Sequence, residues 1–232
     1  MSETCFFEQQ DGSKIAYKIL KSANAKNEVP LVMIMGLSNT KEFYFGLDEE
    51  LAKYQQVIVF DNRGIGESTV ASPNDPMTLE LLAQDTIGLI KHLGIKRFNL
   101  LGEAMGVVQI IDKLYQSASS IFPKTVQEAK DEFLKRERDP NLAKYLLENP
   151  DKLEKVAELV VNSNPRRPLE IMKRQWEANK KCDLTPRLKE IQTPTLIIHG
   201  ESNTMVLIEG AEILDREIPN TKLLKIPNVG HA

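Results

Sequence analysis

The stretch FNLLGEAMG, at residues 98–106, sets the fold of this 232-residue chain. It is a short apolar strand that turns, between Gly102 and Gly106, into an amphipathic run over residues 107–114. A strand that meets a helix across two glycines, with one residue on the bend, has the geometry of a nucleophile elbow. The residue on this bend is Ala104, and its methyl group cannot act as a nucleophile.

The segments on either side of this stretch alternate between strand and helix patterns. Before it, we expect strands over residues 5–8, 14–20, 30–35 and 57–60, with a hairpin turn at Asp11-Gly12, and helices over residues 43–54 and 80–93. After residue 182, the pattern predicts a buried strand over 194–199, a helix over 206–218 and a strand over 222–226. Strands that alternate with helices favour an α/β fold with a mostly parallel, doubly wound sheet.

The stretch from about residue 123 to residue 181 has no strand pattern and is dense in charge. Proline breaks at 140, 150, 165 and 168 divide it into four short helices, each with apolar residues at helical spacing. We therefore interpret residues 122–182 as an inserted helical cap, or lid, and residues 1–121 and 183–232 as the core. The plainer alternative is a set of solvated surface helices.

The composition narrows the classes of function. A net charge of -3, with no cluster of basic residues, gives no reason to expect a nucleic-acid or membrane partner. The longest apolar run, residues 31–35, is far too short to span a bilayer, and the polar N-terminus is unlike a secretory signal. Cys5 and Cys182 have neither metal-ligand spacing nor a disulfide framework. We expect a cytoplasmic protein with no metal and no cofactor.

Five blocks of sequence together resemble a known family. They are MGL at 35–37, DNRGIGES at 61–68, LLGEAMG at 100–106, IIHGESNTMV at 197–206 and PNVGHA at 227–232. In this order and spacing they resemble the α/β-hydrolase fold superfamily, in the branch that includes small esterases, lactonases and carbon–carbon bond hydrolases. The resemblance covers nearly the whole chain outside the lid, and it implies the α/β-hydrolase fold for the core.

The resemblance also implies Ser-His-Asp chemistry. In the family, a serine on the bend attacks an acyl carbon, a histidine after the last strand takes its proton, and a carboxylate after the preceding strand orients the histidine. These positions here hold Ala104, His231 and Asn203. The negative charge on the substrate oxygen would be held by the backbone N–H groups of Leu37 and Met105, which do not depend on side chains.

Some family elements have no counterpart in the sequence. The sixth strand is absent from the pattern because residues 107–115 lead almost directly into the lid, and we expect no closing helix after His231. One face of the sheet should then be partly bare, and a second copy of the chain could cover it in a homodimer. Gly36, Met172 and Trp176 are candidates to line a substrate pocket, although packing is the plainer role for the last two.

Two functions from different classes stay open. The first is a scaffold for hydrolysis of an ester, lactone or related acyl bond, impaired in this chain by Ala104 and Asn203. The second is a non-catalytic protein that still binds a small acyl or apolar molecule in the pocket. Other polar residues have plainer roles: Glu103 lies at a helix start or the surface, Ser68 lies in a turn, and His92 and His199 are structural.

Overall fold

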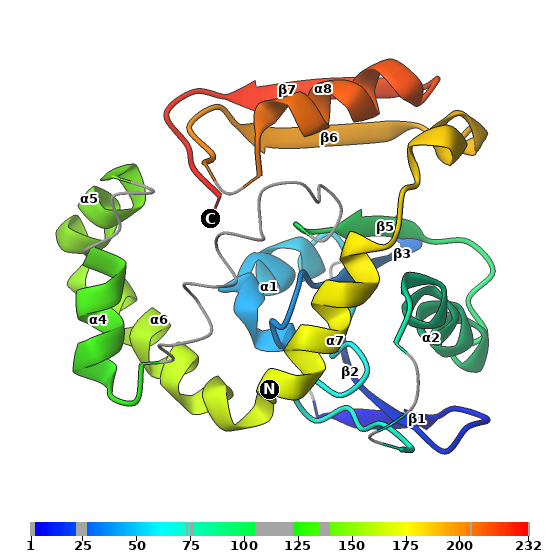
Figure 1. The fold of residues 1–232 in the computed structure, drawn as a ribbon, viewed down its shortest axis with the longest axis horizontal. Coiled ribbons are helices and arrows are strands. Elements are labelled where there is room, and N and C mark those ends of the chain that lie inside the picture. The colour runs from blue at the N-terminus through cyan, green and yellow to red at the C-terminus, as the bar shows by residue number, and fades with distance from the viewer. Residues whose placement is uncertain are drawn as a thin grey trace. The chain divides into compact units, whose positions relative to one another are not determined.

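A computed structural model describes residues 3–21, 27–72, 74, 77–104, 123–134, 140–204 and 206–231. The chain groups into two compact units, residues 1–106 with 163–179 and residues 107–162 with 180–232. Each unit has its own sheet (Figure 1). The predicted cap is therefore shared between the units, because most of its last helix, α7 (Leu169–Lys180), groups with the first unit.

In the first unit, the described residues form a five-stranded sheet in the order β1-β2-β4-β3-β5. The strands are β1 (Cys5–Glu8), β2 (Lys14–Leu20), β3 (Asn27–Ile34), β4 (Gln55–Phe60) and β5 (Asn99–Gly102). β1, β2 and β4 pair antiparallel, whereas β4, β3 and β5 pair parallel. The register of β3 and β5 sets Ile34 opposite Gly102, so the loops that follow these two strands begin side by side.

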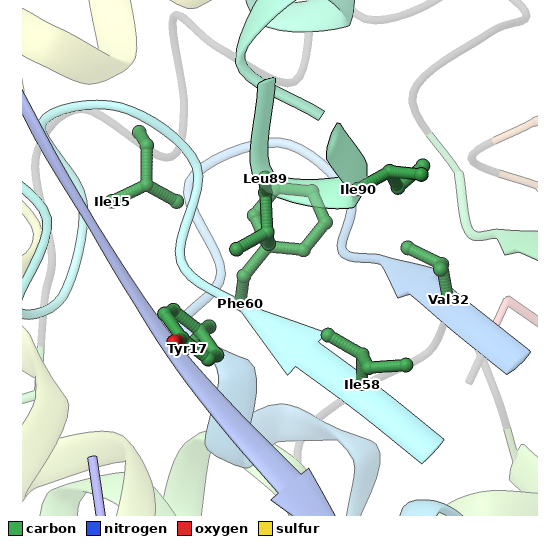
Figure 2. Close-up of a cluster of buried hydrophobic side chains, with 7 residues drawn as sticks. All are labelled: Ile15, Tyr17, Val32, Ile58, Phe60, Leu89 and Ile90. Carbon is green, nitrogen blue, oxygen red and sulfur yellow. The ribbon is translucent and has the colours of Figure 1, made fainter. Parts of the chain in front are cut away.

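Helix α2 (Leu79–His92) forms as the sequence predicts, with caps at both ends. The Thr78 hydroxyl accepts the Leu81 N–H at 3.1 Å, which satisfies one of the free donors of the first turn. Gly94 follows the helix with φ 67, a conformation that glycine adopts without strain. Figure 2 shows the apolar cluster between α2 and the sheet: Ile15, Tyr17, Val32, Ile58, Phe60, Leu89 and Ile90.

The helix expected over residues 43–54 is wrong in its extent. The structure has a 3-10 helix, η1 (Lys41–Tyr44), and a separate helix, α1 (Leu47–Ala52). Phe45 and Gly46 lie between them with φ 51 and φ 91, and a right-handed helix cannot continue through left-handed backbone. Gly46 was the visible signal for this break, since glycine favours such a conformation.

In the second unit, the described residues form a two-stranded parallel sheet of β6 (Thr195–Gly200) and β7 (Thr221–Ile226). Helix α8 (Ile208–Glu217) lies along these strands (Figure 1). The expectation that β6 is buried is wrong for alternate residues, because Leu196 and Ile198 are each 58% exposed. Side chains alternate across a strand, so a single covering helix buries only one face.

Three helices of the predicted cap also belong to the second unit: α4 (Val126–Leu134), α5 (Pro140–Glu148) and α6 (Pro150–Ser163). Two of them begin at the predicted breaks, Pro140 and Pro150, because proline fits the first turn of a helix. The predicted helix over 107–114 and the predicted loss of a sixth strand fall within residues 105–122, outside the described residues. Both stay predictions.

Candidate active site

The bend after β5 has the backbone that a nucleophile elbow requires. Ala104 has φ 55, a left-handed conformation that is uncommon for residues other than glycine. The Glu103 N–H donates to the Ile34 carbonyl at 3.1 Å, which continues the pairing of β5 with β3 beyond Gly102. This pairing ends at the bend, so Ala104 stands at the carboxyl end of the sheet, where ligands bind in open α/β folds.

Gly36 lets the loop after β3 approach this bend. A Cβ atom on Gly36 would lie 3.1 Å from the Ala104 Cβ and 3.1 Å from the Glu103 carbonyl oxygen, which is closer than most side chains tolerate. We expect from the sequence that Gly36 lines a substrate pocket, and the structure places it next to Ala104. Of the two expected oxyanion donors, Leu37 is next to Gly36, whereas Met105 lies outside the described residues.

Hydrogen bonds fix the next residue of this loop, Ser38, which has φ 61. The Ser38 N–H donates to Gln175 Oε1 at 3.1 Å, and its carbonyl accepts from Arg167 Nε at 2.9 Å. Burial lowers the pKa of Arg167 to about 10, which still leaves the guanidinium charged at neutral pH. Upstream, Asn62 Nδ2 donates to the Met35 carbonyl at 3.0 Å. The expected Leu37 donor therefore lies between two anchored residues.

The structure brings together the two other positions of the expected triad, Asn203 and His231. Asn203 follows β6, His231 follows β7, and the Asn203 Nδ2 and His231 Nδ1 atoms are 3.1 Å apart. Gly200 allows the approach of the two loops, because a Cβ there would overlap the Val229 and Gly230 carbonyl oxygens. Asn203 and His231 belong to the second unit, whereas Ala104 belongs to the first.

The orientation of the Asn203 amide decides the chemistry of His231. The Val206 N–H donates to Asn203 Oδ1 at 2.9 Å, so the nitrogen of the amide faces the imidazole. An amide nitrogen only donates, so His231 Nδ1 must accept, and the neutral ring then carries its proton on Nε2. A catalytic base of the Ser-His-Asp type needs the opposite tautomer, with Nε2 free to take a proton.

The family comparison agrees with this architecture. A family model described as "alpha/beta hydrolase fold" matches residues 29–107. The chain has the α/β-hydrolase fold. The α/β-hydrolase fold expected from the sequence is thereby confirmed, whereas the missing sixth strand and C-terminal helix stay predictions.

Solved structures resemble this α/β-hydrolase-fold protein along nearly its whole length. A hydrolase from Pseudomonas aeruginosa has a TM-score of 0.75 and 20% identity, over 99% of this chain and 91% of that one. The enol-lactonase of Burkholderia xenovorans has a TM-score of 0.69 and 21% identity, over 96% and 91%. At these identities the likeness concerns the fold.

Two kinds of curated relative match by sequence. A putative carbamate hydrolase of Cronobacter turicensis is 24% identical over 87% of this chain and 84% of that protein. A proline iminopeptidase of Clostridioides difficile is 32% identical over 43% of this chain, and that match spans only 34% of the iminopeptidase. The matching proteins thus include a putative carbamate hydrolase and a proline iminopeptidase.

Several polar residues of this α/β-hydrolase-fold protein make structural contacts. Ser68 Oγ donates to the Asp61 carbonyl and accepts the Ala16 N–H, each at 2.8 Å. The His92 ring stacks on Phe7, with centroids 4.8 Å apart. His199 Nδ1 lies 2.9 Å from the Gly200 carbonyl oxygen. These contacts agree with the structural roles that we expect for the three residues.

The two expected pocket residues of α7, Met172 and Trp176, are held in the first unit. Met172 packs against the buried cluster of Ile65, Met77 and Ile171, and Trp176 is buried with 2% of its surface exposed. These contacts match the packing role. Contact of either residue with a ligand stays a prediction.

The sequence analysis missed a buried ion pair that holds the DNRGIGES loop. The Lys41 ammonium lies 2.7 Å from Asp61 Oδ2, and neither side chain is exposed. Burial raises the pKa of Asp61, while the ammonium beside it acts in the opposite direction. Lys41 also bonds Glu67 at 2.6 Å, and together these contacts tie η1 to the loop after β4. Lys41 lies two residues before the predicted helix over 43–54, where a lysine is ordinarily solvated, so no local pattern predicts this pair.

The structure gives two findings on wider function classes. Its described residues contain no group of three or more histidine, cysteine, aspartate or glutamate side chains placed to bind a metal. Among the same residues, none of the helices has both the length and the apolar character needed to cross a membrane.

Proposed function

We propose that this protein descends from a hydrolase of esters, lactones or related acyl compounds, and that its own hydrolysis is impaired. The observation that carries the proposal is the bond between Asn203 and His231, 3.1 Å between Nδ2 and Nδ1. As in a Ser-His-Asp site, the side chain at the acid position contacts the histidine. Here, however, that side chain donates the hydrogen bond instead of accepting it. A small acyl or apolar ligand and a cytoplasmic location are part of the same proposal.

Two steps of the reaction are affected. Ala104 supplies no oxygen to form an acyl-enzyme, so covalent catalysis cannot begin. Asn203 holds the proton of His231 on Nε2, so His231 offers a donor where a Ser-His-Asp mechanism needs a base. An aspartate-to-asparagine change in the protease example costs about 10⁴ in turnover for this reason.

The test is a set of reversions assayed with 4-nitrophenyl butyrate: Ala104→Ser, Asn203→Asp and the double variant. We expect turnover above buffer in the double variant only, because serine needs the Nδ1–H tautomer that an aspartate imposes. The matched control is Ala104→Ser with Asn99→Asp, which makes the same amide-to-acid swap at an exposed residue of β5. A folded double variant that hydrolyses no more ester than this control refutes the proposal.

The second candidate is a non-catalytic binding protein, and one observation favours it. Ala104 has the left-handed φ of 55 that a nucleophile elbow requires, although its side chain is not a nucleophile. The left-handed bend at this position therefore does not depend on a serine side chain. If the double variant is inactive but the parent chain binds butyrate in a calorimetric titration, this second function is the correct one.

A further inference from the structure

A short segment before and within α7 holds the loop that carries the expected oxyanion donor. Arg167 donates from Nε to the Ser38 carbonyl at 2.9 Å and from Nη2 to the Ser38 hydroxyl at 3.3 Å. Gln175, two helical turns further along, accepts the Ser38 N–H at 3.1 Å. The N–H, the carbonyl and the hydroxyl of one left-handed residue are thus all bound by this segment.

The segment itself is fixed to the first unit. The Gly66 N–H donates to the Arg166 carbonyl at 2.7 Å, and the guanidinium of Arg167 lies 5.2 Å from the ring centroid of Phe43. Ile171 packs so closely on Gly64 that a Cβ on that glycine would lie 3.1 Å from it. Gln175 therefore has little freedom to move relative to Ser38, as a preorganised binding group requires.

Gln175 has a donor that the protein leaves unused. Its side chain is completely buried, and its Nε2 atom has no hydrogen-bond partner among the described residues. The amide cannot turn around to hide this donor, because Oε1 would then lose the Ser38 N–H. A buried N–H group without a partner is costly, so native proteins keep such a group chiefly where a ligand or water completes it.

We propose that Gln175 is a ligand-binding residue whose Nε2 donates to a carbonyl or carboxylate oxygen of the acyl molecule. This inference rests on the proposed function, since it assigns the ligand to the same loop after β3. Ser38 is next to Leu37, so a ligand oxygen at Gln175 would lie near the expected backbone donor. The unused group is an amide N–H, which donates and therefore selects an acceptor.

The experiment follows the side-chain amide of Gln175 by NMR in the parent chain during titration with hexanoate, hexanamide and hexylamine. Through-bond connection to the backbone assigns the resonance without a variant. We expect both hexanoate and hexanamide, which carry an acceptor oxygen, to shift the Gln175 amide protons. Hexylamine, which has the same chain length and no acceptor oxygen, should leave these protons in place.

Substitutions then measure the contribution of the donor. Gln175→Met should weaken binding of hexanamide roughly 10-fold to 100-fold, the loss typical of a hydrogen bond left unmade in a buried site. Gln175→Glu keeps an acceptor for the Ser38 N–H and should lose hexanoate more completely than hexanamide, because two carboxylates repel. Gln192→Met, the same swap at an exposed glutamine, should leave both affinities unchanged.

The outcomes separate this inference from the proposed function. Binding of either probe with no shift at Gln175, or with equal affinity in Gln175→Met, shows that another group satisfies the amide and overturns the inference. Ester hydrolysis by the reverted double variant without any shift at Gln175 overturns it as well and leaves the proposed function standing. A shift at Gln175 in a chain whose double variant stays inactive supports the inference and rejects the hydrolase ancestry.

Discussion

Replacing Lys41 with methionine should be among the most damaging single changes in the first unit. The Lys41 ammonium and Asp61 carboxylate are both fully buried and lie 2.7 Å apart. At an effective dielectric constant of about 20, their attraction is worth about 6 kcal/mol, much of which offsets the cost of burying the lysine. Methionine has nearly the same length, so the change isolates the charge rather than the packing.

The expected loss reflects what remains around Asp61. Its carboxylate keeps the backbone N–H of residue 41 at 2.7 Å and that of Glu67 at 2.9 Å, so it stays partly satisfied after the ammonium is gone. Removing one partner of a buried pair typically costs 3–5 kcal/mol, and we expect about 3 kcal/mol here. For a chain of this size that lowers the melting temperature by roughly 6–12 °C.

The assay is thermal and urea unfolding of Lys41→Met beside Lys53→Met. Lys53 pairs with Glu50 at 2.6 Å, but both side chains are more than half exposed, so its loss should leave the melting temperature unchanged within error. Lys41→Met with Asp61→Asn should recover part of the loss, since the fully buried carboxylate of residue 61 is then replaced by a neutral amide. If Lys41→Met has the same melting temperature as Lys53→Met, the argument from buried charge is wrong.

Two further predictions concern the same unit. Gly66→Ala should be far more destabilising than Gly46→Ala. Both residues have positive φ, so alanine at either position costs about 1–2 kcal/mol of stability in backbone strain. Only at Gly66 would the new Cβ also overlap Asp61. Differential scanning calorimetry of the pair checks this, and equal losses would contradict it. Burial acts to raise the pKa of Asp11, but its hydrogen bond from Arg63 and other donors outweigh burial, so the folded pKa lies below 3.8. Its stabilisation is thus complete above about pH 4 and is lost as the pH falls through that lower folded pKa; Asp11→Asn should flatten this part of the urea stability profile, and an unchanged slope would count against the pair.

Much of the candidate site could be read from residue types at fixed positions. The bend at Ala104 is predicted by a strand that ends at the first of two glycines. Asn203 and His231 are predicted as site residues because they follow the last two strands. What could not be read is which atoms of these residues meet. The amide of Asn203 has a donor end and an acceptor end, and only the Val206 N–H in the folded loop decides which end faces the histidine.

Local pattern alone determined the order of strands and helices, since caps, turns and apolar spacing act between residues a few positions apart. The hairpin of β1 and β2 and the capped ends of α2 form where the sequence predicts them. Tertiary structure decided the pairing of Lys41 with Asp61 and the hold of Gln175 on Ser38, 137 positions away. Water would satisfy these polar groups equally well in the unfolded chain. The residues next to them in the sequence therefore do not predict the contacts, which form only when the folded core excludes water.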